Sequence, residues 1–232
     1  LIAGSGCIYG GGASDYAAVT NISLSNQSLT TDFLSAFFRR FVNLETISLG
    51  DNNISIVDFS ENNSITDIRL NNNLISNLTA SHLNIQELRA TNNLLSSVNL
   101  TNSVNLTYCI LHTNQLESID VSNNTLLTFL GVITNKLESI DVSNNTVLTY
   151  LGIKDNLISA LDISNNTVLV DLRCDINQLT AAVNSQFLID LDSHGLSNGY
   201  IQSSIFGGGS LTAAGATAKA NLQGKGWTIV GI

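Results

Sequence analysis

The chain has 232 residues, of which 44% are hydrophobic and 12% are charged, and its formal net charge is −9. This apolar content excludes an intrinsically disordered chain, and nine scattered basic residues argue against a nucleic-acid-binding surface, which needs clustered Lys and Arg. No apolar run approaches the roughly 18 residues that a membrane-spanning helix requires.

The first part of the sequence shows little pattern. The sequence contains no Met, even at position 1, so we expect a processed product or a fragment of a longer protein. Residues 1–17 are expected to be a linker or an irregular N-terminal segment. Residues 18–43 are predicted to form an N-terminal cap, with an imperfect first repeat around Ile22 and Leu24 and a helical turn or two over 32–41.

An internal repeat occupies residues 44–182. The pattern is L-x-x-L-x-L-x-x-N-x-L, and it is clearest at Leu44, Ile47, Leu49, Asn52 and Ile54. Seven units in register place an asparagine at the same position, in steps of 20 or 21 residues: Asn52, Asn73, Asn93, Asn114, Asn135, Asn156 and Asn177. The x-L-x-L-x alternation predicts one short strand per unit, with one face buried.

This pattern resembles that of the leucine-rich-repeat family, with short repeats of the bacterial type. The resemblance implies a β-rich α/β solenoid, in which parallel strands stack into a horseshoe or arc. One strand cannot bury its apolar face alone, whereas stacked neighbours form a continuous core. A unit of 20 or 21 residues leaves no room for a full convex helix, so we expect few helices outside the caps. The ladder asparagines are predicted to bond backbone groups of the adjacent coil.

Residues 183–232 are predicted to form a C-terminal capping region. We expect a helix over 181–192, a strand in 199–206, a second helix over 212–223 and a last strand at 227–230. The ending AKANLQGKGWTIVGI resembles the closing segment of surface repeat proteins from bacteria and their phages. The cysteines, Cys7, Cys109 and Cys174, have irregular spacing that predicts neither a disulfide framework nor a zinc site. Cys109 and Cys174 take apolar positions of the repeat and are expected to be buried, inert thiols.

The candidate ligand-binding residues point outward from the predicted strands, on the concave face. Tyr108, Phe129 and Tyr150 share one column, and because neighbouring strands lie about 4.8 Å apart we predict a continuous aromatic strip. Gly131 and Gly152 in the next column are expected to leave a shallow trough. The strip and trough are expected to be flanked by charged residues: Arg69, Arg89 and Arg173, with Asp67, Glu87 and Asp171.

Two interpretations of this patch stay open at the level of sequence. Exposed rings beside a trough would suit a flat ligand such as a sugar ring, or an apolar anchor of a protein partner. Alternatively, the rings form a self-stacking ladder that stabilises the sheet, and the charges are ordinary paired surface.

A second candidate is the carboxylate column Asp58, Asp120, Asp141 and Asp162, of which the last three come from the repeated D-V/I-S motif and are the candidate calcium ligands. Stacked carboxylates repel, and calcium with its oxygen ligands would compensate them. The alternative is that each Asp accepts turn N–H bonds and stays solvated. No other metal and no cofactor is expected.

Catalysis has little support in the sequence. His82, His112 and His194 lie in different units and columns, and only His112 is expected on the concave face. We find no G-x-S-x-G, H-E-x-x-H or P-loop motif. The sequence therefore predicts a non-enzymatic recognition or adhesion module, extracellular or on a cell surface, that binds a glycan or protein. The alternatives are a structural or receptor-binding component of a virus particle, such as a phage tail fibre or decoration protein in contact with other subunits, and an enzyme or an accessory domain of one.

Overall fold

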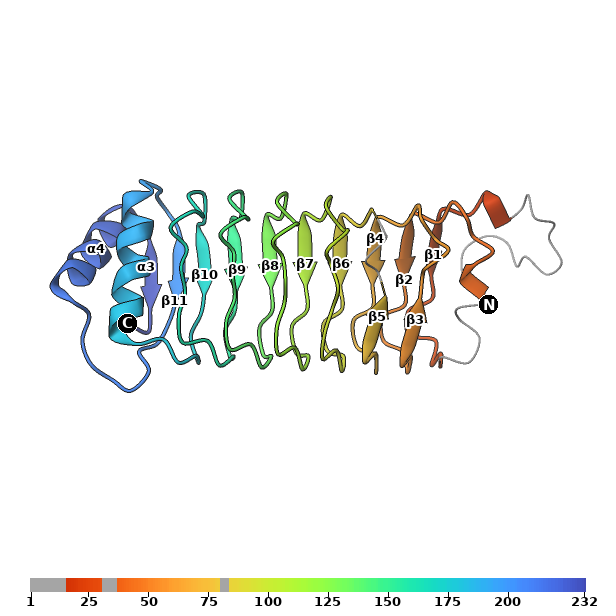
Figure 1. Cartoon of the computed structure of the whole chain (residues 1–232), viewed down its shortest axis with the longest axis horizontal. Coiled ribbons are helices and arrows are strands. Elements are labelled where there is room, and N and C mark those ends of the chain that lie inside the picture. Colours follow the sequence, from red (N-terminus) through yellow and green to blue (C-terminus); the bar gives the residue numbers. More distant parts are fainter. Residues whose placement is uncertain (1–15, 31–36, 80–83) are drawn as a thin grey trace.

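The computed structural model of the protein describes residues 16–30, 37–79 and 84–232 (Figure 1). The expected N-terminal segment 1–17 lies almost wholly outside these ranges, as do Cys7 and His82. Of the helical turn predicted over 32–41, residues 37–38 are helical, and residues 32–36 are not among those described.

A ten-stranded parallel sheet runs the length of the molecule (Figure 1). Its order is β1-β2-β4-β6-β7-β8-β9-β10-β11-β12, so that every strand lies beside the strand of the neighbouring unit. The strands have three residues each and are β1 Asn21–Ser23, β2 Thr46–Ser48, β4 Asp67–Arg69, β6 Glu87–Arg89, β7 Tyr108–Ile110, β8 Phe129–Gly131, β9 Tyr150–Gly152, β10 Asp171–Arg173, β11 Tyr200–Gln202 and β12 Thr228–Val230. The predicted solenoid of stacked parallel strands is therefore confirmed.

The middle residue of each strand faces the core, and the two outer residues face away from it. Pairing in register stacks these middle residues into one row: Ile47, Ile68, Leu88, Cys109, Leu130, Leu151 and Leu172. All of them are fully buried. Period-2 alternation in the sequence thus becomes one buried face shared by all units.

The opposite side of the solenoid is built from the second apolar pair of each unit. Strands β3 (Ile56–Asp58) and β5 (Asn77–Thr79) form a separate parallel pair there. In later units the second residue of this pair is buried without strand pairing, at Val121, Val142 and Ile163. Residues 84–180 contain no helix, as the short repeat length predicts.

The repeated asparagines tie each coil to the coil before it. Asn135 accepts the Leu116 N–H at 3.0 Å and donates to the carbonyls of Leu111 and Val132, both at 3.0 Å. The residue before each ladder asparagine has a left-handed backbone, for example Thr134 with φ of 56°. The predicted structural role of the asparagine ladder is confirmed, because its amide satisfies backbone groups that the turn leaves unpaired.

The C-terminal region replaces the repeat by two packed helices, α3 (Ala181–Ser193) and α4 (Ala213–Gly224). The side chains of Thr180 and Thr212 cap their N-termini. Strands β11 and β12 extend the sheet beyond β10, and Lys225 at the end of α4 contacts Asp192 of α3 at 2.6 Å. The predicted helices and strands of this region are all present, and no helix in the described part of the protein is long and apolar enough to span a membrane.

Candidate functional site

The predicted aromatic strip exists on the outward face of the ten-stranded sheet, here called the open face. Tyr108, Phe129 and Tyr150 begin the neighbouring strands β7, β8 and β9. The ring centroids of Tyr108 and Phe129 lie 4.5 Å apart with planes 20° apart, and those of Phe129 and Tyr150 lie 3.9 Å apart with planes 2° apart. In-register parallel strands place the three rings at stacking distance, because the strand spacing is close to that distance.

Arginine side chains extend this stack at both ends. The Arg89 guanidinium carbon lies 4.4 Å from the Tyr108 ring centroid, and that of Arg173 lies 5.4 Å from both the Tyr150 and Tyr200 centroids. The result is one continuous column across six strands, here called the Arg–aromatic ladder, made of Arg89, Tyr108, Phe129, Tyr150, Arg173 and Tyr200. Its members stabilise one another through stacking and cation–π contacts.

The ladder does not offer the flat platform that the sequence suggested. Phe129 has one ring against each of its faces, and the outer faces of Tyr108 and Tyr150 are turned to Arg89 and Arg173. Solvent therefore meets ring edges, a tyrosine hydroxyl and guanidinium groups. A sugar ring that stacks on an aromatic needs a free ring face, which Tyr108, Phe129 and Tyr150 do not offer in this arrangement.

The two glycines do not form an open trough, and this corrects the sequence prediction. Gly131 and Gly152 are buried. A Cβ on Gly131 would lie 2.4 Å from Cε1 of His112, and a Cβ on Gly152 would lie 2.6 Å from the Tyr150 hydroxyl. Each glycine is needed because a neighbouring ring occupies the space of its missing side chain.

His112 is fixed on the open face by a backbone hydrogen bond. Its Nδ1 accepts the Ile133 N–H at 3.0 Å, so the neutral ring carries its proton on Nε2. Burial, reinforced by the positive charge of Arg173, lowers the pKa of His112. The ring is therefore neutral at physiological pH, and it presents a donor.

Each arginine of the open face is paired with the acidic residue two positions before it. Arg69 contacts Asp67 at 2.6 Å, Arg173 contacts Asp171 at 3.0 Å, and Arg89 pairs with Glu87. The expected charged flank is present, and its carboxylates are the less exposed partners: the side chains of Arg69 and Asp67 are 46% and 18% exposed. Guanidinium groups rather than carboxylates thus meet solvent.

Partial burial lowers the pKa of Arg89, but hydrogen bonding to Glu87 and its charge outweigh burial, and the Arg89 pKa lies above its ordinary value. At Arg173 the hydrogen bond to Asp171 comes first among the causes, and the Arg173 pKa is also raised. Both guanidinium groups keep their charge under all physiological conditions.

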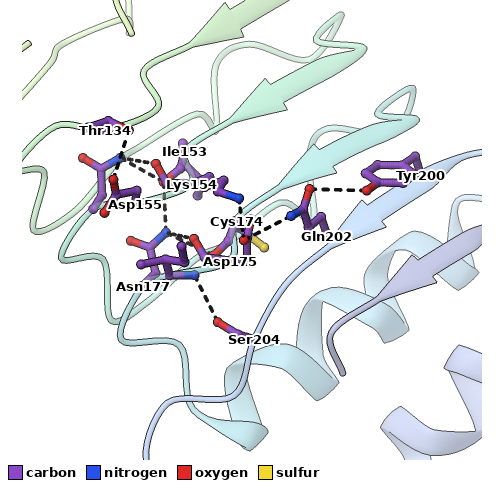
Figure 2. Close-up of polar contacts among 12 residues, drawn as sticks. Thr134, Ile153, Lys154, Asp155, Cys174, Asp175, Asn177, Tyr200, Gln202 and Ser204 are labelled. Atoms are coloured by element: carbon purple, nitrogen blue, oxygen red, sulfur yellow. Dashed lines mark hydrogen bonds and ion pairs between the residues drawn. The ribbon is translucent and has the colours of Figure 1, made fainter. Parts of the chain in front are cut away.

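A polar network fixes the strand ends at the C-terminal side of the ladder (Figure 2). Lys154 contacts the buried Asp175 at 3.0 Å, and Gln202 donates to the same carboxylate at 3.1 Å. The Tyr200 hydroxyl donates to Gln202 at 3.3 Å, which links the ladder to the network. Three neighbouring strands, β9 to β11, are held in register by these contacts.

The carboxylate column has the geometry expected if each Asp accepts hydrogen bonds from the backbone of its own turn. Backbone N–H groups of Ser122, Ser143 and Ser164 donate to Asp120, Asp141 and Asp162 at 2.9, 2.9 and 3.0 Å. Hydrogen bonds from these serines lower the pKa of all three carboxyls. Within the described ranges, no three His, Cys, Asp or Glu side chains gather into a group that could hold a metal ion. This arrangement favours the turn interpretation over calcium.

Cys109 and Cys174 are buried free thiols, as predicted. Burial raises the pKa of each to about 12, so neither is a thiolate at neutral pH. They occupy different rows of the core, Cys109 beside Leu130 and Cys174 one residue beyond β10.

Sequence reasoning missed one member of the open face, Tyr200, and one contact of another, His112. Tyr200 pairs with Asp171 and so continues the aromatic column into the capping region, although no repeat motif precedes it. His112 was expected to face this side, but its contact with Gly131 follows only from the fold. The signal for Tyr200 was its place at the start of the predicted strand.

No protein-family model matches the chain, and no curated protein matches it. Among solved structures, the functional domain of InlJ from Listeria monocytogenes, described as including a cysteine ladder, is similar with a TM-score of 0.75 and 27% identity. That match covers 89% of this chain and 48% of that one, so the chain spans about half the length of the InlJ domain.

Two further solved structures are similar. Internalin C2 from Listeria monocytogenes matches with a TM-score of 0.63 and 26% identity, over 72% of this chain and 76% of that one. A leucine-rich-repeat protein of Leptospira interrogans matches with a TM-score of 0.66 over 94% of this chain and 67% of that one; at 18% identity it supports the fold alone. The repeat pattern, the parallel-sheet solenoid and these neighbours together show that the chain has the leucine-rich-repeat fold.

Proposed function

We propose that the protein is a non-enzymatic recognition or adhesion module, extracellular or on a cell surface, that binds a protein through its open face. The observation that carries this proposal is the Arg–aromatic ladder. Tyrosine and arginine are the residue types that contribute most to protein–protein binding energy, and here they form one rigid column. Because their neighbours already fix the side chains, little conformational entropy is lost on binding.

The geometry supports a protein partner more than a glycan. The ring faces that would stack on a sugar are covered within the chain, whereas ring edges, hydroxyls and guanidinium groups suit backbone carbonyls and side chains of a protein surface. InlJ and internalin C2, two structural neighbours above 25% identity, are bacterial proteins, which supports a bacterial surface more than a virus particle.

The test is a cell-binding assay with labelled protein on a panel of host and bacterial cells. The ladder variant Tyr108→Ala/Phe129→Ala/Tyr150→Ala is compared with a control variant in the same three repeats, Leu126→Ala/Val147→Ala/Val168→Ala. The control residues are exposed apolar side chains that lie outside the strands. Both variants are first shown to be folded by circular dichroism and thermal unfolding.

We expect the ladder variant to lose at least about tenfold in affinity, since truncated hot-spot residues commonly cost more than about 1.4 kcal/mol, and the control variant to bind like the natural protein. Protease treatment of the cells should abolish binding. Equal binding by both variants would show that the ladder is only structural. Binding that survives protease but is lost after periodate oxidation of cell-surface sugars would identify a glycan as the ligand.

A further inference from the structure

A small hollow lies on the open face beside the Arg89 end of the ladder. Its volume is about 310 Å³, and it is lined by Asn71, Asn72, Arg89, Thr91, Ile110 and His112. These residues belong to β6 and β7 and to the turns that follow β4, β6 and β7, so three neighbouring units build it. This volume is at the lower end of the range of ligand pockets, about 300–1,000 Å³, and it is large enough for one side chain of a partner.

Arg89 and His112 bring hydrogen-bond donors to the hollow. Arg89 uses Nε to bind Glu87, and its two Nη groups have no acceptor among the residues that the structure describes. His112 accepts at Nδ1, which leaves the Nε2 proton as a donor without a partner in the same part of the protein. A residue with charged donors and a residue with a neutral donor therefore both line the hollow.

The remaining polar groups add further donors and a hydroxyl. The Asn71 side-chain oxygen accepts the Thr91 N–H at 2.9 Å, so its amide NH₂ is left to bind a ligand. The Thr91 hydroxyl makes no hydrogen bond within the described ranges and can donate or accept. The side chain of Asn72 already makes two hydrogen bonds: its amide NH₂ donates to Asp51 at 2.7 Å, and its oxygen accepts from Asn92 at 3.0 Å. The side-chain groups left free are thus donors, together with one hydroxyl.

From this arrangement we propose that the hollow binds a carboxylate of the protein partner, either that of an Asp or Glu residue or that of the partner's C-terminus. A carboxylate is planar, carries a single charge and accepts several hydrogen bonds, which matches a guanidinium edge with additional N–H donors. A dianion such as phosphate is disfavoured, because Glu87 already balances Arg89 and the whole protein has a net charge of −9. That the carboxylate belongs to a protein partner rests on the proposed function. That the hollow binds a carboxylate does not.

The experiment follows the Cε1 proton of His112 by NMR during titration with sodium acetate at about pH 7.5 and constant ionic strength, with chloride as the exchanged anion. At this pH the imidazole is neutral, so its shift reports binding rather than titration. We expect a saturable shift at His112. Arg89→Gln should weaken apparent acetate affinity at least about tenfold, the effect of losing one charge-assisted hydrogen bond. Thr91→Val provides a second variant that keeps the charge and the neighbouring ion pair, and it should weaken binding by a smaller factor.

The matched control is Arg69→Gln. Arg69 pairs with Asp67 as Arg89 pairs with Glu87, at the same position of the preceding strand, and it also lies 3.9 Å from Glu87, but it does not line the hollow. Acetate should bind to this variant as to the natural protein. A shift that is not saturable, an equal loss in Arg69→Gln and Arg89→Gln, or tighter binding of phosphate than of acetate would each overturn the proposal.

Two model compounds then distinguish the sources. N-acetylglutamic acid α-amide carries only the carboxylate of a glutamate side group, and N-acetylglycine carries only a terminal backbone carboxylate; the one that binds more tightly identifies the carrier. Because these titrations need no partner, their result is independent of the cell-binding assay. If the hollow does not bind acetate but the ladder variant loses cell binding, only the carboxylate proposal fails. If the hollow binds acetate but the ladder variant binds cells normally, only the proposed function fails.

Discussion

At position 131 the missing side chain is a requirement of packing rather than of backbone conformation. A Cβ there would lie 2.4 Å from Cε1 of His112, closer than two carbon atoms that are not bonded to each other can approach. We predict that Gly131→Ala lowers the free energy of unfolding by about 1–3 kcal/mol, because the imidazole must move and its hydrogen bond with Ile133 is strained or lost. Urea denaturation measures this change.

The control for this prediction is the same substitution in a His112→Ala background. There the space is free, so Gly131→Ala should have little effect on stability, and the double-mutant cycle should show a coupling of similar size to the single-mutant loss. If the cost of Gly131→Ala is the same in both backgrounds, the His112 contact is not its cause.

Ile176 is the exception in the row of left-handed residues that precedes the asparagine ladder. Its φ is 55° and its side chain is 57% exposed, whereas the earlier units have Asn, Asp or Thr there. Ile176 is the only apolar residue of this row, and it shares with Thr113 and Thr134 a branched Cβ that is strained in this region, while asparagine tolerates it. We predict that Ile176→Asn raises the free energy of unfolding by about 1 kcal/mol. Ile176→Val keeps the branched Cβ and should leave stability unchanged in the same thermal unfolding assay; an equal gain from both would attribute the effect to exposed apolar area.

Among the structural elements, the repeated turn depends on its asparagine more than on any other polar residue. Asn135 makes hydrogen bonds to backbone groups of two coils, and an alanine would leave the part-buried Leu116 N–H without a partner. The carbonyls of Leu111 and Val132 would each keep one donor, from the neighbouring asparagines of the ladder. We predict that Asn135→Ala costs about 1–3 kcal/mol of stability, the cost of one unsatisfied group. The control is Asn144→Ala, which removes one exposed hydrogen bond to Ser122 and should change stability by less than half as much. Similar losses in the two variants would contradict the structural role of the ladder.

At the scale of the whole molecule, each unit contacts only its neighbours, so the ends should open before the middle. The C-terminal end is held by Lys225 and Asn221 of α4, which contact Asp192 of α3 at 2.6 and 2.8 Å. Burial raises the pKa of Asp192, but these two partners outweigh burial, and the pKa lies below its ordinary value. The carboxylate therefore contributes stability at neutral pH, and this contribution is lost as the pH falls below 3.8 through the pKa of the folded state.

Hydrogen–deuterium exchange at neutral pH tests this view of the cap. Asp192→Asn should speed amide exchange in α4 and β12 and leave exchange in β7 and β8 unchanged, because the repeats between them are not disturbed. Uniform acceleration along the sequence would instead show that the solenoid opens as one cooperative unit. The natural protein should exchange most slowly in its central strands.

Much of the fold could be predicted from the sequence because repeat proteins are determined by local, periodic patterns. The spacing of Leu and Asn determined the strand positions, the parallel stacking and the buried row, and a unit of 20 or 21 residues excluded a convex helix. The column of Tyr108, Phe129 and Tyr150 followed from the same register, since parallel pairing without offset places equivalent residues side by side.

The groups that the open face offers to a ligand depend on the directions of its side chains. Only the tertiary structure decided these directions. Equivalent positions could be aligned from the sequence. The sequence could not show that the His112 ring lies over Gly131 or that the Tyr150 ring lies over Gly152. Nor could repeat periodicity place Tyr200, in the capping region, at the end of the ladder, or gather Asn71, Thr91 and His112 around one hollow. Periodicity specifies which residues are neighbours across strands, whereas the rotamers that cover a ring face or leave a donor free depend on the packing of all neighbours at once.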